Sequence, residues 1–563
     1  IRDIAAIGDV QYHGQSTYDE GGNSGWFIEA PEPKDYFWVG GSGNWSDVAH
    51  WSNESGGEPA ECLRGASDNV YFDENSFAEG SSTVTLDLPE STCHNMDWTG
   101  AQFEPVFTGG TDHELVITGD LTLEEGLIWA APGQLWLRGS GERTLSADGV
   151  TCGSYGIHGD AEGGSGGLAD SLSLPNGYFH VDEGGLNTNG HDVHVRRFIS
   201  NNSNVRSIDL EDSQITLDQY WFMQDTTNLT FDAGTSTILW NAGNTLSFDG
   251  GGETFHILQA TISSGAGYLR GDPTFKQVTK LGGGILRVED GVTVDETLHV
   301  AEGTLTLFSD SQIETLAPEP GVTMSLGDSA VQTVGSLLGD GTCSQLIRLE
   351  STDNIGKAIL SVSEGEVAVS HYQIRNIEAV GGATFTAASS LDTGGNVGWS
   401  ILPSEPVDYY WIGGTGSWGD GAHWAHESGG ASTGCAPSFQ DGAIFDEASF
   451  PETGGTLTLD LPLAECHHMT WTGVQNAPNV QGGNDQHLTI YGNLVLNSAM
   501  SWSAVGDIRL EGPGEKLLDP QGVQLGSYAL RLDDEDASWT LASELSLNQG
   551  YLFLEHGGLD TAG

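Results

Sequence analysis

A long internal repeat constrains the fold of this chain more than any other feature. The stretch DYFWVGGSGNWSDVAHWSNESGG, which begins at Asp35, returns as DYYWIGGTGSWGDGAHWAHESGG from Asp408, and 408 − 35 = 373. The same offset carries CHNMDWTG at Cys93 onto CHHMTWTG at Cys466 without a gap, and 35 of the 66 positions from 35 to 100 are identical. A period this long predicts a repeating unit that is one or more whole domains, not a single supersecondary element.

The two ends of the sequence fall inside repeats. Ile1 is the equivalent of Ile374, and Gly563 is the equivalent of Gly190. We therefore expect these residues to be a window from a longer array of similar units, in which no start Met or signal peptide would be visible.

Net charge limits the partners of the chain. The 18 basic and 79 acidic residues give 18 − 79 = −61, and the acidic residues are spread along the whole sequence. A nucleic-acid surface needs clustered Lys and Arg, so nucleic acid is excluded as a partner. Such a density of carboxylates suits an extracellular protein in salty water. No apolar run approaches 18 residues, so no transmembrane segment is expected in this window.

The residue pattern predicts an all-β fold. Apolar residues mostly alternate or stand in short β-branched runs that Gly, Asn and Asp interrupt. From about residue 113 to residue 360, short strands such as HELVITG and GGGILRV recur every 8 to 12 residues without helical intervals. This regular spacing of short strands favours a parallel β-helix or solenoid, which follows a small Trp-rich β module in each unit. Serial β-sandwiches are the alternative.

Paired prolines and closing motifs suggest the domain boundaries. Each copy ends in GGNxGW, at Trp26 and Trp399, and a Pro-containing connector follows it. The expected organisation is the end of a preceding repeat (1–30), a linker (31–34), a Trp-rich module (35–110), a β-helix-like region with its GGNxGW cap (111–401), a linker (402–407), a second Trp-rich module (408–483) and the start of a second β-helix-like region (484–563).

Half of the sixteen tryptophans lie in the two Trp-rich modules at matched positions. We interpret them as a small aromatic core under Gly-rich turns. Stacking of the indoles on sugar rings is the alternative. The eight residues are Trp38, Trp45, Trp51, Trp98, Trp411, Trp418, Trp424 and Trp471.

Two cysteine pairs recur at the same offset. Cys62 and Cys93 match Cys435 and Cys466, which predicts one disulfide within each module. Cys152 corresponds to Leu525, and Cys343 has no second copy, so both are expected to be free and buried.

Two acidic loops are candidate Ca²⁺ sites, and Ca²⁺ is the only cofactor that the sequence suggests. DNVYFDENSF and DGAIFDEASF place oxygen ligands close together, as Ca²⁺ requires. An Asp-capped turn that leads into a strand is the alternative. The six carboxylates are Asp68, Asp73, Glu74, Asp441, Asp446 and Glu447.

These motifs together resemble repeat units of very large secreted surface proteins of Bacteroidota. The resemblance rests on YFWVGGSGNW with its following HW, on FDxxSF, on the C-H-x-M-x-W-T-G segment and on GGNxGW. It implies export by the type IX system, as for the mobile adhesin of gliding motility, and an elongated acidic filament outside the outer membrane. It also implies O-glycosylation at Asp-Ser/Thr motifs, for which Ser171, Thr226, Ser329 and Thr561 are the candidates.

The sequence favours a structural or adhesive repeat over an enzyme. No zinc-protease motif or phosphate loop with Lys is present. The expected role is a repeat of an extracellular surface filament in adhesion or gliding, with neighbouring repeats, other filament subunits and surface polysaccharide as partners. The alternatives are a β-helix lyase or hydrolase that acts on polysaccharide and a carbohydrate-binding or phage-fibre-like module.

Overall fold

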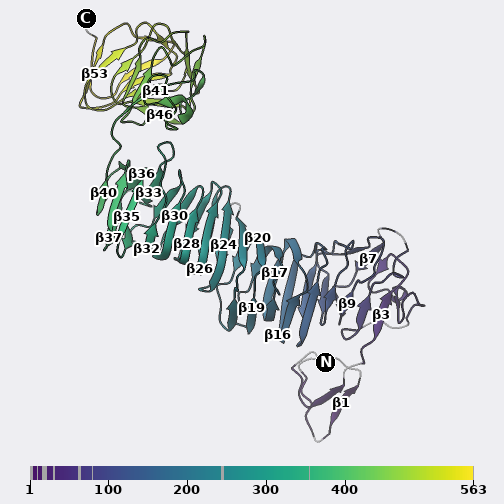
Figure 1. Cartoon of the computed structure of the whole chain (residues 1–563). Coiled ribbons are helices and arrows are strands. Elements are labelled where there is room, and N and C mark those ends of the chain that lie inside the picture. Colours follow the sequence, from purple (N-terminus) through teal and green to yellow (C-terminus); the bar gives the residue numbers. More distant parts are fainter. Residues whose placement is uncertain are drawn as a thin grey trace. The chain divides into compact units, whose positions relative to one another are not determined.

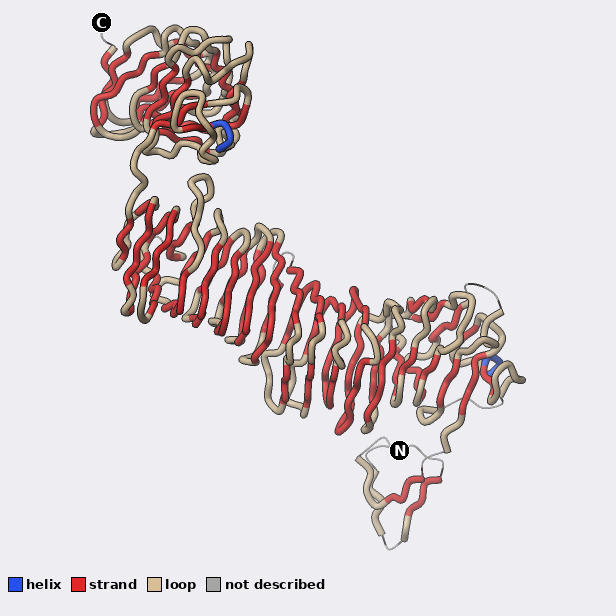
Figure 2. The backbone as a smooth tube through the Cα atoms, in the orientation of Figure 1, coloured by secondary structure: helices blue, strands red, loops and turns tan. Residues whose placement is uncertain are grey.

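Parallel strand pairing dominates the chain (Figures 1 and 2). The computed structural model describes residues 4–8, 10–15, 22–29, 32–60, 65–78, 80, 82–242, 246–353 and 355–561. Strands make up 51% of the chain and form a parallel β-solenoid of about 22 turns. The all-β, solenoid expectation is therefore confirmed, and serial sandwiches are not needed.

The chain divides into two compact units. The first comprises residues 1–317, 324–337 and 351–363, and the second comprises residues 318–323, 338–350 and 364–563. The only helices found among the described residues are two single-turn 3-10 helices, η1 (Val48–His50) and η2 (Gly421–His423), so that part of the chain contains no helical candidate for a bilayer span.

Three ladders of parallel strands build the C-terminal part of the second unit. The first ladder is β41 (Asp408–Trp411), β44 (Gly442–Phe445), β47 (His468–Trp471), β50 (Leu494–Val495), β53 (Gly514–Asp519), β56 (Ala537–Leu541) and β59 (Gly558–Asp560). The second is β42 (Gly416–Ser417), β45 (Thr456–Leu459), β48 (Asn479–Gly482), β51 (Ser501–Trp502), β54 (Gln524–Leu525) and β57 (Ser546–Leu547). The third is β46 (Leu463–Cys466), β49 (His487–Ile490), β52 (Ile508–Leu510), β55 (Ala529–Leu532) and β58 (Tyr551–Leu554).

The first unit begins with the same ladders, 373 residues earlier. The equivalents are β3 (Asp35–Trp38), β6 (Asn69–Tyr71), β9 (Met96–Asp97), β12 (Leu121–Thr122) and β15 (Glu142–Ser146); β4 (Gly43–Asn44), β7 (Thr83–Leu86), β10 (Val106–Gly109) and β13 (Ile128–Trp129); and β8 (Glu90–Cys93), β11 (Glu114–Ile117), β14 (Gln134–Arg138), β16 (Gly156–Leu168) and β17 (Leu172–Asn187). The register repeats too, because Val106 pairs with Thr83 as Asn479 pairs with Thr456.

The Trp-rich module forms the first turns of the solenoid. The β8–β11–β14 and β7–β10–β13 ladders pass across residue 110 without a break in pairing. At the start of the module, β5 (Trp51–Ser52) pairs antiparallel with β3 and supplies a partner for this strand. The second copy has the same hairpin between β43 (Trp424–Ala425) and β41. This hairpin gives each module a defined beginning.

The turns between residues 193 and 362 continue the ladders. Their strands are β18 (Val193–Ile199), β19 (Arg206–Asp209), β20 (Gln214–Phe222), β21 (Leu229–Asp232), β22 (Thr237–Ala242), β23 (Leu246–Asp249), β24 (Thr254–Ile262), β25 (Ala266–Arg270), β26 (Thr274–Leu281), β27 (Ile285–Val288), β28 (Thr293–Val300), β29 (Thr304–Leu307), β30 (Ser311–Pro318), β31 (Thr323–Leu326), β32 (Val331–Leu337), β33 (Ile347–Ser351) and β34 (Ala358–Val362).

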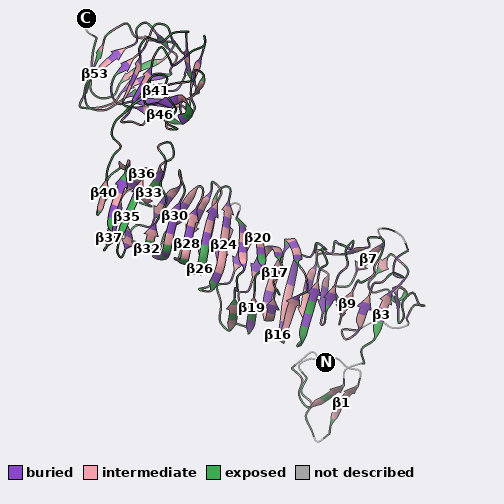
Figure 3. Ribbon diagram, in the orientation of Figure 1, coloured by how far each residue is buried: buried purple, intermediate pink, exposed green. Residues whose placement is uncertain are grey.

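Alternation along each strand separates the core from the outer faces (Figure 3). Leu135 pairs with Ile157 and Ile157 with Phe179, so one turn here takes 157 − 135 = 22 residues. Inward positions form columns, such as Phe198, Trp221 and Phe248, which are 0–1% exposed. Adjacent rings in this column lie 4.2 Å and 5.5 Å apart between centroids. Stacked side chains of like shape fill the narrow interior.

The GGNxGW motif leads into the last strand of a ladder in both copies. Strands β35 (Glu366–Ser370), β38 (Thr384–Ala388) and β40 (Trp399–Ile401) form one ladder, whose last strand begins at Trp399. Strands β36 (Tyr372–Arg375), β37 (Ile377–Gly381) and β39 (Leu391–Asp392) lie between them in sequence. The Asn396 side chain accepts the Ile377 N–H at 3.0 Å. In the first copy, where β1 (Tyr12–Gln15) pairs with β2 (Trp26–Glu29), Asn23 accepts the Ile4 N–H at 2.9 Å. The N-terminal stretch thus has the local structure of the end of a repeat.

Candidate functional site

The eight module tryptophans lie in the core and leave no indole face for a ligand. Each is at most 1% exposed. Trp38 donates its indole N–H to Gly41 O at 2.7 Å, and Trp411 donates to Gly414 O at the same distance. His50 stacks on Trp38 with ring centroids 4.9 Å apart, as His423 does on Trp411. The arrangement supports the interpretation as an aromatic core, not sugar stacking.

The carboxylates proposed for Ca²⁺ bind backbone N–H groups in the structure. Asp68 accepts hydrogen bonds from Lys34 N and Gly65 N, at 3.0 and 2.5 Å. Its equivalent Asp441 accepts from Val407 N at 3.1 Å and from the Ser438 hydroxyl at 2.6 Å.

The two later aspartates form short turns. Asp73 accepts from Asn75 N, and Asp446 from Ala448 N, both at 2.9 Å. Glu74 and Glu447 are exposed beside these turns. The contacts match the alternative of Asp-capped turns, and Ca²⁺ binding stays a prediction.

The disulfide differs from the predicted pairing. Cys435 is bonded to Cys343, with Cα atoms 5.6 Å apart, and Cys466 is buried outside any disulfide. The predicted Cys435–Cys466 bond and the free state expected for Cys343 are therefore wrong. The spacing within one copy could not reveal this partner, because Cys343 lies in a loop of the preceding turns and is 92 residues away.

The other cysteines give a mixed result. Cys152 is buried without a disulfide, as expected, and burial raises the pKa of its thiol to about 12. Cys93 is buried. Cys62 lies outside the described residues, so the Cys62–Cys93 bond stays a prediction.

Three of the four candidate glycosylation residues are exposed, namely Ser171, Ser329 and Thr561, and Thr226 is half-buried. The Ser171 hydroxyl accepts the Asp192 N–H at 3.3 Å. The adjoining Asp170 carboxylate accepts the Ala147 N–H at 2.7 Å and is therefore held in the structure. O-glycosylation stays a prediction.

An outward column of rings on β14, β16 and β17 was not expected from the sequence. Trp136 pairs with His158, and His158 with His180, in three successive turns. The Trp136 and His158 rings lie 4.0 Å apart, and the two imidazoles lie 4.3 Å apart with 16° between their planes. Because β-solenoid turns stack in register, equivalent outward positions are brought into contact.

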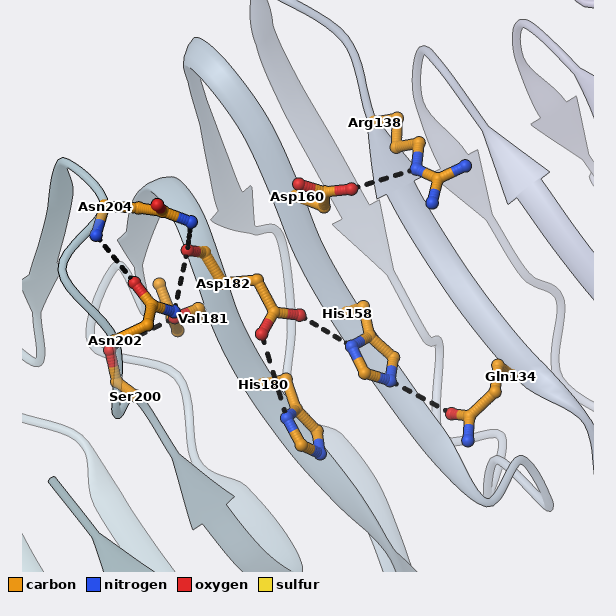
Figure 4. Close-up of polar contacts among 10 residues, drawn as sticks. All are labelled: Gln134, Arg138, His158, Asp160, His180, Val181, Asp182, Ser200, Asn202 and Asn204. Carbon is orange, nitrogen blue, oxygen red and sulfur yellow. Dashed lines mark hydrogen bonds and ion pairs between the residues drawn. The ribbon is translucent and has the colours of Figure 1, made fainter.

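Asp182 faces both imidazoles of this column (Figure 4). His158 Nδ1 lies 2.6 Å from one carboxylate oxygen of Asp182, and His180 Nδ1 lies 4.0 Å from the other. On its far side, His158 Nε2 donates to Gln134 Oε1 at 3.1 Å. Burial, with the neighbouring His158 as a smaller cause, lowers the pKa of His180 to about 4, although Asp182 opposes this shift. His180 is therefore a neutral imidazole near pH 7.

Side-chain amides, drawn in Figure 4, hold the backbone next to this cluster, and a buried arginine supports them. Asn202 and Asn204 each donate to the carbonyl of Asp182 at 3.0 Å. Arg206, only 1% exposed, donates to the Ser200 hydroxyl at 2.8 Å and also to Asn202 O. Among the described residues, His158, His180 and Asp182 are the one group of three or more His, Cys, Asp or Glu with its ligand atoms all within 4.8 Å of one another.

A signal for this cluster exists in the sequence once the turn length is known. QLWLR, GIHGD and YFHVD align when the turns of 22 residues are superposed, so that Trp136, His158 and His180 share one column. Two residues further along each turn, at the next outward position, lies Arg138, Asp160 or Asp182. Without the turn length the sequence does not reveal this cluster, because His158 and His180 lie 22 residues apart and form no local ligand motif.

The structure defines this chain as a parallel β-solenoid. No family model, curated protein or solved structure matches the chain.

Proposed function

We propose that the chain is a structural and adhesive repeat of a long extracellular surface filament. The observation that carries this proposal is the strand-for-strand recurrence of the opening ladders at a constant offset of 373, with the same register and the same buried tryptophans. A solenoid grows by stacking turns, so repeated units add length without a new fold. Tandem copies also multiply weak contacts into avidity.

Surface chemistry supports an extracellular setting for this filament. The net charge of −61 keeps a solenoid hydrated and limits sideways association. The Cys343–Cys435 disulfide is of a kind that persists in oxidising compartments. The resemblance to Bacteroidota surface proteins adds type IX secretion and gliding motility to the proposal. Neighbouring repeats and other filament subunits are its proposed partners.

Carbohydrate binding is a second candidate, because an aromatic row lies on the outer face of the first unit. Tyr178, Arg197 and Tyr220 occupy neighbouring turns in register, with the guanidinium of Arg197 4.5 Å and 5.0 Å from the two ring centroids. Exposed Tyr155 hydrogen-bonds with Tyr178 at 2.8 Å. Such rings can stack on sugars of a surface polysaccharide.

Electron microscopy of the native, full-length protein tests the filament proposal. A repeat of 373 residues at 22 residues per turn and a rise of about 4.8 Å per turn predicts a period of roughly 80 Å plus its linker. We expect thin fibres with this period. Compact particles without a period would overturn the proposal. Glycan-array binding that Tyr178→Ala abolishes, but Tyr528→Ala leaves unchanged, would support the second candidate.

A further inference from the structure

Polar groups lie along one edge of the Trp136–His158–His180 column, and the proposed filament role does not require them. Two imidazole nitrogens and one carboxylate converge there from β16 and β17, and all three side chains are half-buried. We propose that His158, His180 and Asp182 bind one divalent transition-metal ion of the zinc, nickel or copper type. His158 Nδ1, His180 Nδ1 and a carboxylate oxygen of Asp182 are its ligands, and one further coordination position faces solvent.

The spacing of the three donor atoms fits such an ion. A tetrahedral site with metal–ligand bonds of about 2.1 Å places its ligand atoms about 3.4 Å apart. The contacts at 2.6 Å and 4.0 Å from Asp182 to the two imidazoles bracket this value. Because a metal ion lies near the plane of each imidazole that it binds, the His180 ring must also turn out of its stack on His158, from which its plane now differs by 16°.

The surroundings hold His158 and the Asp182 backbone in place. The hydrogen bond from His158 Nε2 to Gln134 Oε1 directs Nδ1 toward Asp182, as partners of metal-bound histidines commonly do. Both ring nitrogens of His158 face acceptor oxygens, so a cation is favoured at Nδ1. Asn202 and Asn204 fix the Asp182 backbone through its carbonyl.

The donor set also selects the kind of ion. Imidazole suits zinc, copper and nickel, whereas Ca²⁺ takes six to eight oxygen ligands and Mg²⁺ requires an octahedron of oxygens. Three protein ligands cannot close a tetrahedral shell, so a water molecule completes it. This site is distinct in residues and in chemistry from the acidic loops around Asp68 and Asp441.

Calorimetric titration of the whole chain with Zn²⁺, and separately with Ni²⁺, tests the site. We expect one equivalent to bind, with His180→Ala weakening that binding at least 100-fold. Gln134→Ala should weaken it by roughly 10- to 100-fold, through loss of orientation. Excess Ca²⁺ should not compete.

His194 provides a matched control. Its Nε2 lies 2.8 Å from Asp218 across one solenoid turn, but no second imidazole belongs to that pair. His194→Ala should therefore bind Zn²⁺ as the unaltered chain does. Circular dichroism establishes that each variant is folded, and Co²⁺ loading should give the visible absorption of a four-coordinate site only while His180 is present. Unchanged binding in a folded His180→Ala variant, or equal loss in His194→Ala, would overturn the proposal.

Discussion

Trp38 shows how one side chain stabilises the start of a repeat. Its indole is fully buried, meets Trp51 edge to face at 5.0 Å and donates to Gly41 O. Trp38→Ala would create a large cavity and leave that carbonyl without its donor, so we expect a loss of about 3 to 5 kcal/mol. Hydrogen exchange of residues 35–110 measures the effect. Trp136→Ala, on the outer face, is the control, and equal protection in the two variants would contradict the assignment.

Basic residues are scarce in this chain, and several of them lie inside the solenoid. Lys280 is fully buried and donates to Gly282 O and to Glu302 O. Lys516, 7% exposed, donates to Glu511 O at 2.9 Å. Like Arg206, these side chains satisfy backbone carbonyls at corners of the coil, where strand pairing stops.

The buried Lys280 makes stability depend on pH in the alkaline range. Burial lowers its pKa to about 8 from an ordinary 10.5. Between these values the unfolded chain binds more protons than the folded chain, so the free energy of unfolding rises with pH there and is level below pH 8. The rise should be about 3 kcal/mol. Denaturant unfolding of the unaltered chain and of Lys280→Met across pH 7 to 11 measures the difference, and a difference that falls with pH would contradict it.

Asp441 distinguishes a capped turn from a calcium loop. Both of its carboxylate oxygens accept hydrogen bonds, from Val407 N and from Ser438. Asp441→Ala should cost about 1 to 3 kcal/mol because these donors lose their acceptor. The loss should be the same in EDTA and in millimolar CaCl₂. Thermal unfolding of the second unit measures it, with the exposed Glu447→Ala as control. A loss seen only with CaCl₂ would instead establish the calcium interpretation.

At the scale of elements, the Cys343–Cys435 disulfide ties the loop after β32 to the loop after β43. A bond across 92 residues restricts the unfolded chain and should contribute about 4 to 5 kcal/mol. Cys343→Ser should therefore lower the melting temperature of the second unit, and reduction should have no further effect on that variant. Cys466→Ala is the control for loss of a buried sulfur. Peptide mapping without reduction should recover Cys343 joined to Cys435, whereas a Cys435–Cys466 peptide would contradict the structure.

The elements differ in how far the sequence could predict them. The succession of short strands and Gly turns predicted the solenoid. Within a strand, the alternation of residues such as Leu135 and Trp136 indicates which side chain faces the core. The same alternation does not report the register between turns. For that reason, neither the His158–His180 contact nor the partner of Cys435 could be predicted. The change of composition near residue 110 suggested a domain boundary, but the strand ladders continue across it.

At the scale of the whole molecule, charge opposes the stacking that builds the fold. Neighbouring strands lie about 4.8 Å apart, so outward carboxylates in successive turns lie well within a Debye length at 0.1 M salt. Asp209 and Asp232 are such a pair, directly in register on β19 and β21. With 79 acidic and 18 basic residues, most carboxylates have no basic partner available to them.

Ionic strength should therefore raise the stability of the molecule as a whole. Screening weakens the repulsion between turns, while the buried columns such as Phe198, Trp221 and Phe248 are unaffected by salt at moderate concentration. We expect the melting temperature to rise by several degrees between 10 mM and 300 mM NaCl and then to level off. Calorimetry in NaCl, KCl and choline chloride separates screening, which is equal for the three salts, from binding of a particular cation. A melting temperature that stays constant or falls would show that the carboxylates are too well hydrated for their repulsion to limit stacking.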